Sequence, residues 1–180
     1  MSKWSQFGKK LLERIFGVVN ADPKSVSITI SIPFQSTGGR KVEKIQLSRP
    51  VDKEFPISSR FGSRMINGKE EFHNGVDFAV PVGTPVYACE DGAAFRCGCQ
   101  DAENQKVGYG LRVWQEFERM EDKARVRYYI WLGHLSKILV KEGSRIKKGD
   151  LIAYSGNTGR STGAHLHISV RKLDSKDFSD

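Results

Sequence analysis

The feature that most constrains the fold is a series of short apolar stretches that starts at Phe55 and continues almost to the end of the chain. These stretches are rich in β-branched and aromatic residues, and glycine or proline interrupts them, as in Val80–Val86 and Gly108–Gly110. No long helical periodicity lies between them. Short, punctuated strands of this kind are typical of antiparallel β structure. We therefore predict a mainly β fold in which antiparallel sheets form a sandwich or an incompletely closed barrel.

The residues before this region follow other patterns. Apolar side chains spaced by three and four residues predict a short N-terminal amphipathic helix, and they are Trp4, Phe7, Leu11, Ile15 and Val18. Apolar and polar side chains alternate strictly from Val26 to Ile32, which predicts a half-buried strand. A second extended stretch after the turn "STGGR" predicts its hairpin partner. We expect residues 1–50 to serve targeting or docking and residues 51–180 to form the main domain. The apolar face of this predicted helix is more typical of a helix that packs on its own domain or on a partner than of one that binds a membrane surface.

Composition limits the class of protein. A length of 180 residues suits one main domain, and a formal net charge of +8 favours polyanionic partners such as teichoic acids, lipid headgroups or nucleic acids. The basic residues are scattered and no recognition motif is present, which argues against nucleic acid. No apolar run approaches the roughly 20 residues of a membrane span. Because Glu13 and Arg14 interrupt the one stretch that resembles a signal peptide, we expect synthesis in the cytoplasm without the usual secretion signal.

The three cysteines, Cys89, Cys97 and Cys99, cannot all pair within one chain. We interpret them as free thiols of a protein made in a reducing compartment. A second metal site at Cys97 and Cys99 is the less favoured alternative, because structural zinc sites usually place about two to four residues between their cysteines and need a second pair.

The histidines carry the strongest chemical signal. All of them lie beyond residue 70, and they are His73, His134, His165 and His167. His73 and Asp77 are four residues apart among strand-like neighbours, so both side chains should lie on one face. His165 and His167 are two residues apart, so on a strand they project together while their apolar neighbours face a core.

Each of these residues alone is compatible with a solvated strand face or with a hydrogen-bonded core histidine. Two pairs at compatible spacing, with a further candidate at His134, favour a metal site instead. Imidazole nitrogens and carboxylate oxygens are good zinc donors, and three protein ligands with one open position are the pattern of a catalytic zinc. No H-E-x-x-H glutamate is present, so a general base has to come from elsewhere.

Several longer motifs occur together between Pro56 and Val170: "ISSRFGSR", "FHNGVDFAVPVGTPVYACEDG", "VGYGLRV" and "GHLSKILVKEGSRIKKGDLIAYSGNTGRSTGAHLHISV". In this order they resemble the lysostaphin-type peptidoglycan endopeptidases, also called LytM-like peptidases. The resemblance implies a β fold with a central groove and zinc-dependent hydrolysis of peptide bonds in bacterial peptidoglycan, in cross-links or stem peptides. It gives no guide to residues 1–50.

The resemblance also implies roles for single residues. His73 and Asp77 match the family's H-x-x-x-D element and His167 matches the second histidine of its H-x-H element, which implies that these three bind one zinc ion per chain. His165 and His134 match the other two active-site histidines of the family. They are expected to transfer protons or to stabilise the tetrahedral oxyanion.

Two other hypotheses remain open. The chain could be a phage tail or secretion-machine component that docks through residues 1–50 and hydrolyses the wall locally, or it could be a zinc-stabilised module that binds the wall. In every case we expect it to act on the cell wall, in the periplasm, outside the cell or on a virion.

Because the active-site residues begin at His73, deletion of residues 1–20 should preserve hydrolysis of soluble wall fragments and impair targeting. Turnover of soluble fragments and binding to whole walls, measured on the same shortened chain, separate the two effects. A folded shortened chain that no longer hydrolyses soluble fragments contradicts this division of roles.

Overall fold

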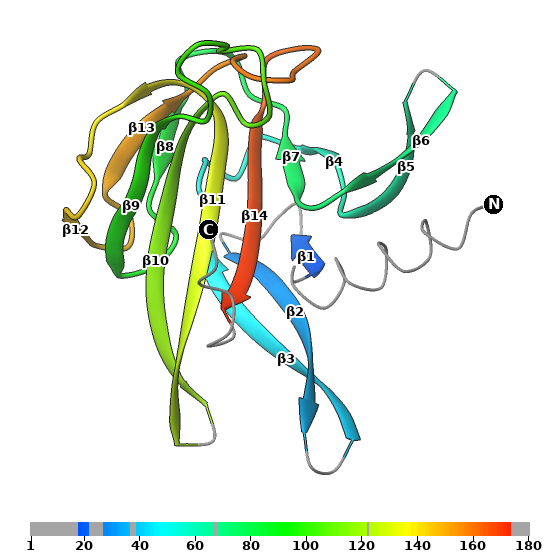
Figure 1. Ribbon diagram of the computed structural model, residues 1–180, viewed down its shortest axis with the longest axis vertical. Helices are drawn as coiled ribbons and strands as arrows, with labels where there is room; N and C mark the ends of the chain where they lie inside the picture. The colour runs from blue at the N-terminus through cyan, green and yellow to red at the C-terminus, as the bar shows by residue number, and fades with distance from the viewer. Residues whose placement is uncertain (1–17, 22–26, 37–38, 67, 122, 174–180) are drawn as a thin grey trace.

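The structure is a computed structural model that describes residues 18–21, 27–36, 39–66, 68–121 and 123–173 (Figure 1). These residues form fourteen β-strands and no helix. Every strand pairing among them is antiparallel. The predicted mainly β, antiparallel architecture is therefore confirmed.

Nine strands form the main sheet. They are β4 (Ile57–Ser59), β7 (Val76–Phe78), β8 (Pro85–Tyr87), β9 (Gly92–Cys99), β10 (Leu111–Glu121), β11 (Ala124–Ile138), β12 (Arg145–Ile146), β13 (Leu151–Ser155) and β14 (Leu166–Leu173). The strand order is β12-β9-β10-β11-β14-β7-β4, and β13 pairs with both β11 and β8. The path ends at β12 and β4, so the described strands do not close into a complete barrel.

Two smaller sheets flank the main one (Figure 1). One is the hairpin of β5 (Gly62–Ile66) and β6 (Lys69–His73), and the other contains β1 (Val18–Ala21), β2 (Ser27–Ser36) and β3 (Gly39–Ser48). The pairing of β2 with β3 confirms the predicted N-terminal hairpin. Most of the predicted N-terminal helix lies outside the described residues, but its last apolar residue, Val18, belongs to strand β1.

The core is built from alternating side chains of the main sheet. In β14, Leu166, Ile168 and Val170 are fully buried, as the two-residue alternation predicts. Full burial of such a side chain contributes about 1.5–3 kcal/mol. Ile45 and Leu47 of β3 are also buried in this core, so the second strand of the N-terminal hairpin is packed into the main domain.

The cysteines have no disulfide partners, as predicted: Cys89 is buried, and Cys97 and Cys99 are partly buried. Burial, together with the charge of Glu90, raises the pKa of the Cys89 thiol far above its usual range. Within the described part of the chain, the cysteines join no cluster of three or more metal donors. In the same residues, no helix is long and apolar enough to cross a membrane.

Gln115 satisfies two backbone groups inside the core. Its fully buried side chain accepts a hydrogen bond from the N–H of Cys89 at 3.0 Å and donates one to the carbonyl of Glu90. Gln115→Leu would leave both groups without partners, at about 1–3 kcal/mol each. We expect the free energy of unfolding, measured by urea denaturation, to fall by about 2–4 kcal/mol. Gln46→Leu, at an exposed position of β3, is the control, and equal stability of the two variants would contradict this account.

Candidate active site

A groove of about 500 Å³ runs past one end of the main sheet. It is lined by the β5–β6 hairpin, by β7, by the loop that precedes β10 and by the loop of residues 156–165. The two loops are tied together, since the N–H of Arg160 donates to the carbonyl of Gly108 at 2.8 Å. All histidines of the chain line this groove, and they are His73, His134, His165 and His167.

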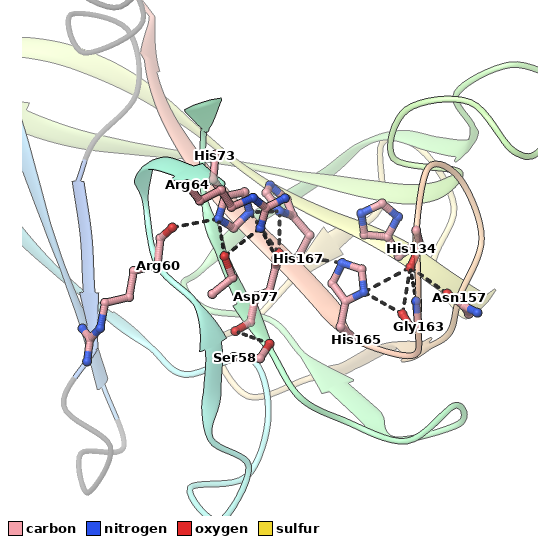
Figure 2. Close-up of polar contacts among 12 residues, drawn as sticks. Ser58, Arg60, Arg64, His73, Asp77, His134, Asn157, Gly163, His165 and His167 are labelled. Atoms are coloured by element: carbon pink, nitrogen blue, oxygen red, sulfur yellow. Dashed lines mark hydrogen bonds and ion pairs between the residues drawn. The ribbon is translucent and has the colours of Figure 1, made fainter. Parts of the chain in front are cut away.

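Three donor atoms converge in the groove: Nε2 of His73, Oδ1 of Asp77 and Nδ1 of His167 (Figure 2). Nε2 of His73 lies 3.1 Å from Oδ1 of Asp77 and 3.1 Å from Nδ1 of His167. The Nδ1 of His167 lies 2.9 Å from the same Oδ1. All three residues are buried, at 5%, 6% and 3% exposure. Such a set of close, buried donors could hold one metal ion.

Strand pairing brings these donors together. β7 and β14 pair so that His167 lies directly opposite Asp77, although the two residues are 90 positions apart in the chain. His73 enters from the end of β6. His73 and Asp77 do not share one strand, on which their even spacing would place both side chains on one face, because Asn74 and Gly75 separate β6 from β7. The two side chains meet because the chain turns between them.

His73 is held through its other ring nitrogen. Its Nδ1 lies 2.9 Å from the carbonyl of Arg60 and 3.2 Å from Oγ of Ser59. Because a carbonyl only accepts, Nδ1 carries the proton and donates it. The lone pair of Nε2 is then directed at the other donors, which is the orientation that a metal-binding histidine requires.

His134 lies at a β-bulge, where the pairing of β10 with β11 shifts register between Leu111 and Val113. Its φ of 60° is in the left-handed region, which is uncommon for residues other than glycine. The backbone N–H of His134 donates to the carbonyl of Tyr109, and its Nδ1 donates to the carbonyl of Thr158, both at 2.7 Å. The ring is therefore fixed, and its Nε2 is available for proton exchange.

His165 lies beside His134, with ring centroids 4.4 Å apart. Its Nδ1 donates to the carbonyl of Gly163 at 2.8 Å, and its Nε2 lies 3.7 Å from Oδ1 of Asp77. His165 precedes β14 and forms an isolated bridge with Gly156, so only His167 of the predicted pair lies within the strand. Both rings nevertheless line the same groove.

Burial controls the protonation of this cluster. It lowers the pKa of His134 to about 4, although the hydrogen bond to Thr158 opposes this shift. Burial also lowers the pKa of His167, against the effect of its hydrogen bond to Asp77. Burial raises the pKa of Asp77, but its polar contacts with His167 and His73 outweigh this effect and hold that pKa well below its usual range. At neutral pH the site therefore holds an ionised Asp77 beside neutral His134 and His167 rings.

Sequence reasoning missed several residues that line the groove. Tyr109 accepts a hydrogen bond from Nδ2 of Asn74 at 2.7 Å, and its ring centroid lies 5.1 Å from that of His167. Arg160, in the loop before β14, forms an ion pair with Glu71 of β6. The motifs "VGYGLRV" and "SGNTGRSTGAH" marked both loops, but spacing alone did not show that these side chains reach the site.

Arg64 was also missed, although it lies in the recognised motif "ISSRFGSR". Its Nη1 donates to Oδ2 of Asp77 at 3.1 Å and to Oγ of Ser59 at 2.7 Å. Its place in this motif was the one sequence feature that could have identified it. No pattern of charges in the sequence indicates that Arg64 contacts Asp77.

Two imidazoles and one carboxylate in an open groove, with two more histidines beside them, are the donor and acid–base groups expected of a metallopeptidase. The fold and the site therefore define a metal-dependent hydrolase. The chain belongs to Peptidase family M23, whose sequence profile matches residues 71–178.

Proteins similar to this chain include a peptidoglycan endopeptidase, an antimicrobial peptidase and a zinc-containing peptidase. The peptidoglycan DD-endopeptidase ShyA of Vibrio cholerae is 36% identical over 140 residues, which are 76% of this chain and 30% of that protein. The catalytic domain of lysostaphin from Staphylococcus simulans matches with a TM-score of 0.53 and 32% identity, over 67% of this chain and 84% of that one. A zinc-containing peptidase from Vibrio cholerae matches with a TM-score of 0.55 and 26% identity, over 82% of this chain and 54% of that one. The chain spans about a third of the length of curated relatives such as ShyA.

Gly75 allows β14 to approach the turn between β6 and β7. A Cβ at this position would lie 2.3 Å from the carbonyl oxygen of Ile168 and 2.6 Å from Nε2 of His167. Gly75→Ala should therefore displace the His167 ring, and we expect the affinity for a divalent metal to fall about 10- to 100-fold. Competition with a chromogenic chelator measures this. Gly163→Ala is the control, because a Cβ there meets nothing within 4 Å, and equal affinity of the two variants would contradict the assignment.

Proposed function

We propose that this chain is a zinc-dependent endopeptidase that hydrolyses peptide bonds in bacterial peptidoglycan. The observation that carries the proposal is the convergence of His73, Asp77 and His167 in an open groove, with His134 and His165 beside them. Membership of Peptidase family M23 supports the reaction, and the similarity to a peptidoglycan DD-endopeptidase supports the substrate.

The donor set fits a single zinc ion. Neutral imidazole nitrogen and carboxylate oxygen are preferred zinc ligands, and three protein ligands leave one position open. A cation bound by His73, Asp77 and His167 would also compensate the buried charge of Asp77, which is only 6% exposed. Bound zinc supplies Lewis acidity, which polarises a scissile carbonyl and makes water acidic enough to attack at neutral pH.

His134 and His165 are the proposed proton-transfer residues. Each donates its Nδ1 proton to a backbone carbonyl, so the Nε2 of each ring presents a lone pair to the groove. Because its Nδ1 is engaged by the carbonyl of Thr158 and its ring lines the groove, His134 is the proposed acceptor of a proton from the attacking water. His165 lies nearer to Asp77 and is suited to stabilise the tetrahedral oxyanion or to pass a proton to the leaving amine.

We further propose that residues 51–180 form the peptidase domain and that residues 1–50 contribute targeting or docking. The family match begins at residue 71, which supports a separate role for the N-terminal part, although Ile45 and Leu47 of β3 pack into the core of the peptidase domain. The partner class that fits a docked wall hydrolase is a phage tail or a secretion machine. The formal net charge of +8 supports association with anionic wall polymers, and the proposed place of action is the cell wall, in the periplasm, outside the cell or on a virion.

Single histidine variants separate metal binding from proton transfer. His134→Ala and His165→Ala should keep about one zinc per chain but lose about 10²- to 10⁴-fold in turnover, which is typical for loss of a positioned acid or base. His167→Ala and Asp77→Ala should lose the zinc as well. Zinc content after dialysis and turnover of soluble wall fragments are measured on each variant. A metal-free His165→Ala beside a metal-replete His167→Ala would show that the two roles are reversed.

Mass spectrometry of fragments released from purified peptidoglycan tests the proposed function itself. We expect fragments with new amino and carboxyl termini at one type of peptide bond. Their release should stop when a chelator removes the metal and resume when zinc is restored. Tight binding to walls without release of fragments would contradict the proposal and would favour a zinc-stabilised wall-binding module.

A further inference from the structure

Arg64 links two of the proposed metal ligands. Its Nη1 donates to Oδ2 of Asp77 at 3.1 Å and to Oγ of Ser59 at 2.7 Å. The Oγ of Ser59 lies 3.2 Å from Nδ1 of His73. One guanidinium nitrogen therefore contacts Asp77 directly and His73 through a single hydroxyl group, and Figure 2 shows Arg64 beside this cluster.

The two carboxylate oxygens of Asp77 have different surroundings. Oδ1 faces the histidines, at 3.1 Å from His73, 2.9 Å from His167 and 3.7 Å from His165. Oδ2 faces Arg64. A rotation of the carboxylate that turned both oxygens toward the histidines would break the charge-assisted hydrogen bond to Arg64, so this bond opposes the rotation.

The β5–β6 hairpin explains why Arg64 reaches this position. Its register places Gly62 opposite His73. Because side chains two residues apart share a face of a strand, Arg64 lies on the same face of the hairpin as His73. The same element therefore supplies one proposed ligand and the cation that contacts another.

The number of ligand atoms gives this arrangement a consequence for catalysis. A carboxylate can bind a metal through one oxygen or through two. If Asp77 used both oxygens, they and the nitrogens of His73 and His167 would fill the four positions of a tetrahedral zinc, and water could enter only as a fifth ligand. With one oxygen of Asp77, a position stays open for the reaction.

We propose that Arg64 is a positioning residue that restricts Asp77 to one oxygen, Oδ1, and so keeps a coordination position open. The inference rests on the proposed function, because it assumes a metal held by His73, Asp77 and His167. Outer hydrogen-bond partners are known to fix the orientation of metal ligands in this way.

A merely structural ion pair is the competing explanation. Exposed ion pairs contribute little to stability. The side chain of Arg64 is 32% exposed, but that of Asp77 is only 9% exposed and contacts the proposed metal ligands. A structural pair would change unfolding and leave the metal geometry unaltered, whereas a positioning residue would change the geometry.

The test uses Arg64→Met, Arg64→Lys and, as a control, Lys69→Met, which removes one exposed charge from the other strand of the same hairpin. The full-length variants are loaded with zinc or cobalt(II), and three quantities are compared: metal content, visible absorption of the cobalt form and turnover of soluble wall fragments. Cobalt(II) absorbs strongly in four-coordinate sites and weakly in sites with more ligands.

We expect Arg64→Met to keep its metal and its unfolding temperature while the visible absorption of its cobalt form falls. Its turnover should drop about 10- to 100-fold. Arg64→Lys, which keeps a charged donor, should recover part of the cobalt absorption and part of the turnover. Lys69→Met should match the unaltered chain. An unchanged cobalt spectrum in Arg64→Met, in a chain that still binds metal and cuts peptidoglycan, would overturn this inference alone. An unaltered chain that binds no metal would overturn the proposed function and this inference with it.

Discussion

The site depends on one strand pairing, that of β7 with β14. It sets His167 opposite Asp77 across 90 residues of sequence, and the other polar contacts of the cluster are arranged around that carboxylate. β6 brings His73 to one side of it, β5 brings Arg64 to another, and the approach to β14 brings His165 to a third. A one-residue slip of β14 would turn His167 into the core and Ile168 into the groove.

This arrangement carries an energetic cost that shapes its chemistry. A buried carboxylate is unfavourable unless it is paired or hydrogen-bonded, and here the pairing comes from His73, His167 and Arg64. The left-handed backbone of His134 adds strain of a kind that is often found at functional sites. A bound cation would offset part of the electrostatic cost, so metal binding should stabilise the folded chain. The site therefore couples its own stability to the metal on which the proposed reaction depends.

Much of the fold was predictable because strands have a simple period. The alternation of Leu166, Ile168 and Val170 identified the buried face of β14, and the alternation before Ile32 identified the N-terminal hairpin. The candidate site residues were found because four histidines are few and their spacings matched a family. The predicted helix falls mostly outside the described residues, apart from Val18, which is part of a strand.

The remaining features were not predictable, because they depend on turns and on contacts between distant segments. His73 and Asp77 lie on different strands. The turn between them depends on the close approach of Gly75 to the carbonyl of Ile168, a contact between distant segments of the chain. The bulge at His134 follows from the register of β10 and β11, which local periodicity does not report. The contact of Arg64 with Asp77 needs the position of the whole β5–β6 hairpin.

The central claim is that His73, Asp77 and His167 hold one metal ion with one position left open. Anomalous X-ray diffraction from crystals of the zinc-loaded chain tests it most directly, because the anomalous signal locates zinc independently of the protein. The account predicts one zinc bound by Nε2 of His73, a single oxygen of Asp77 and Nδ1 of His167, at about 2.0–2.2 Å, with a non-protein ligand in the fourth position. A zinc ion enclosed by four protein side chains, or bound elsewhere in the chain, would contradict it.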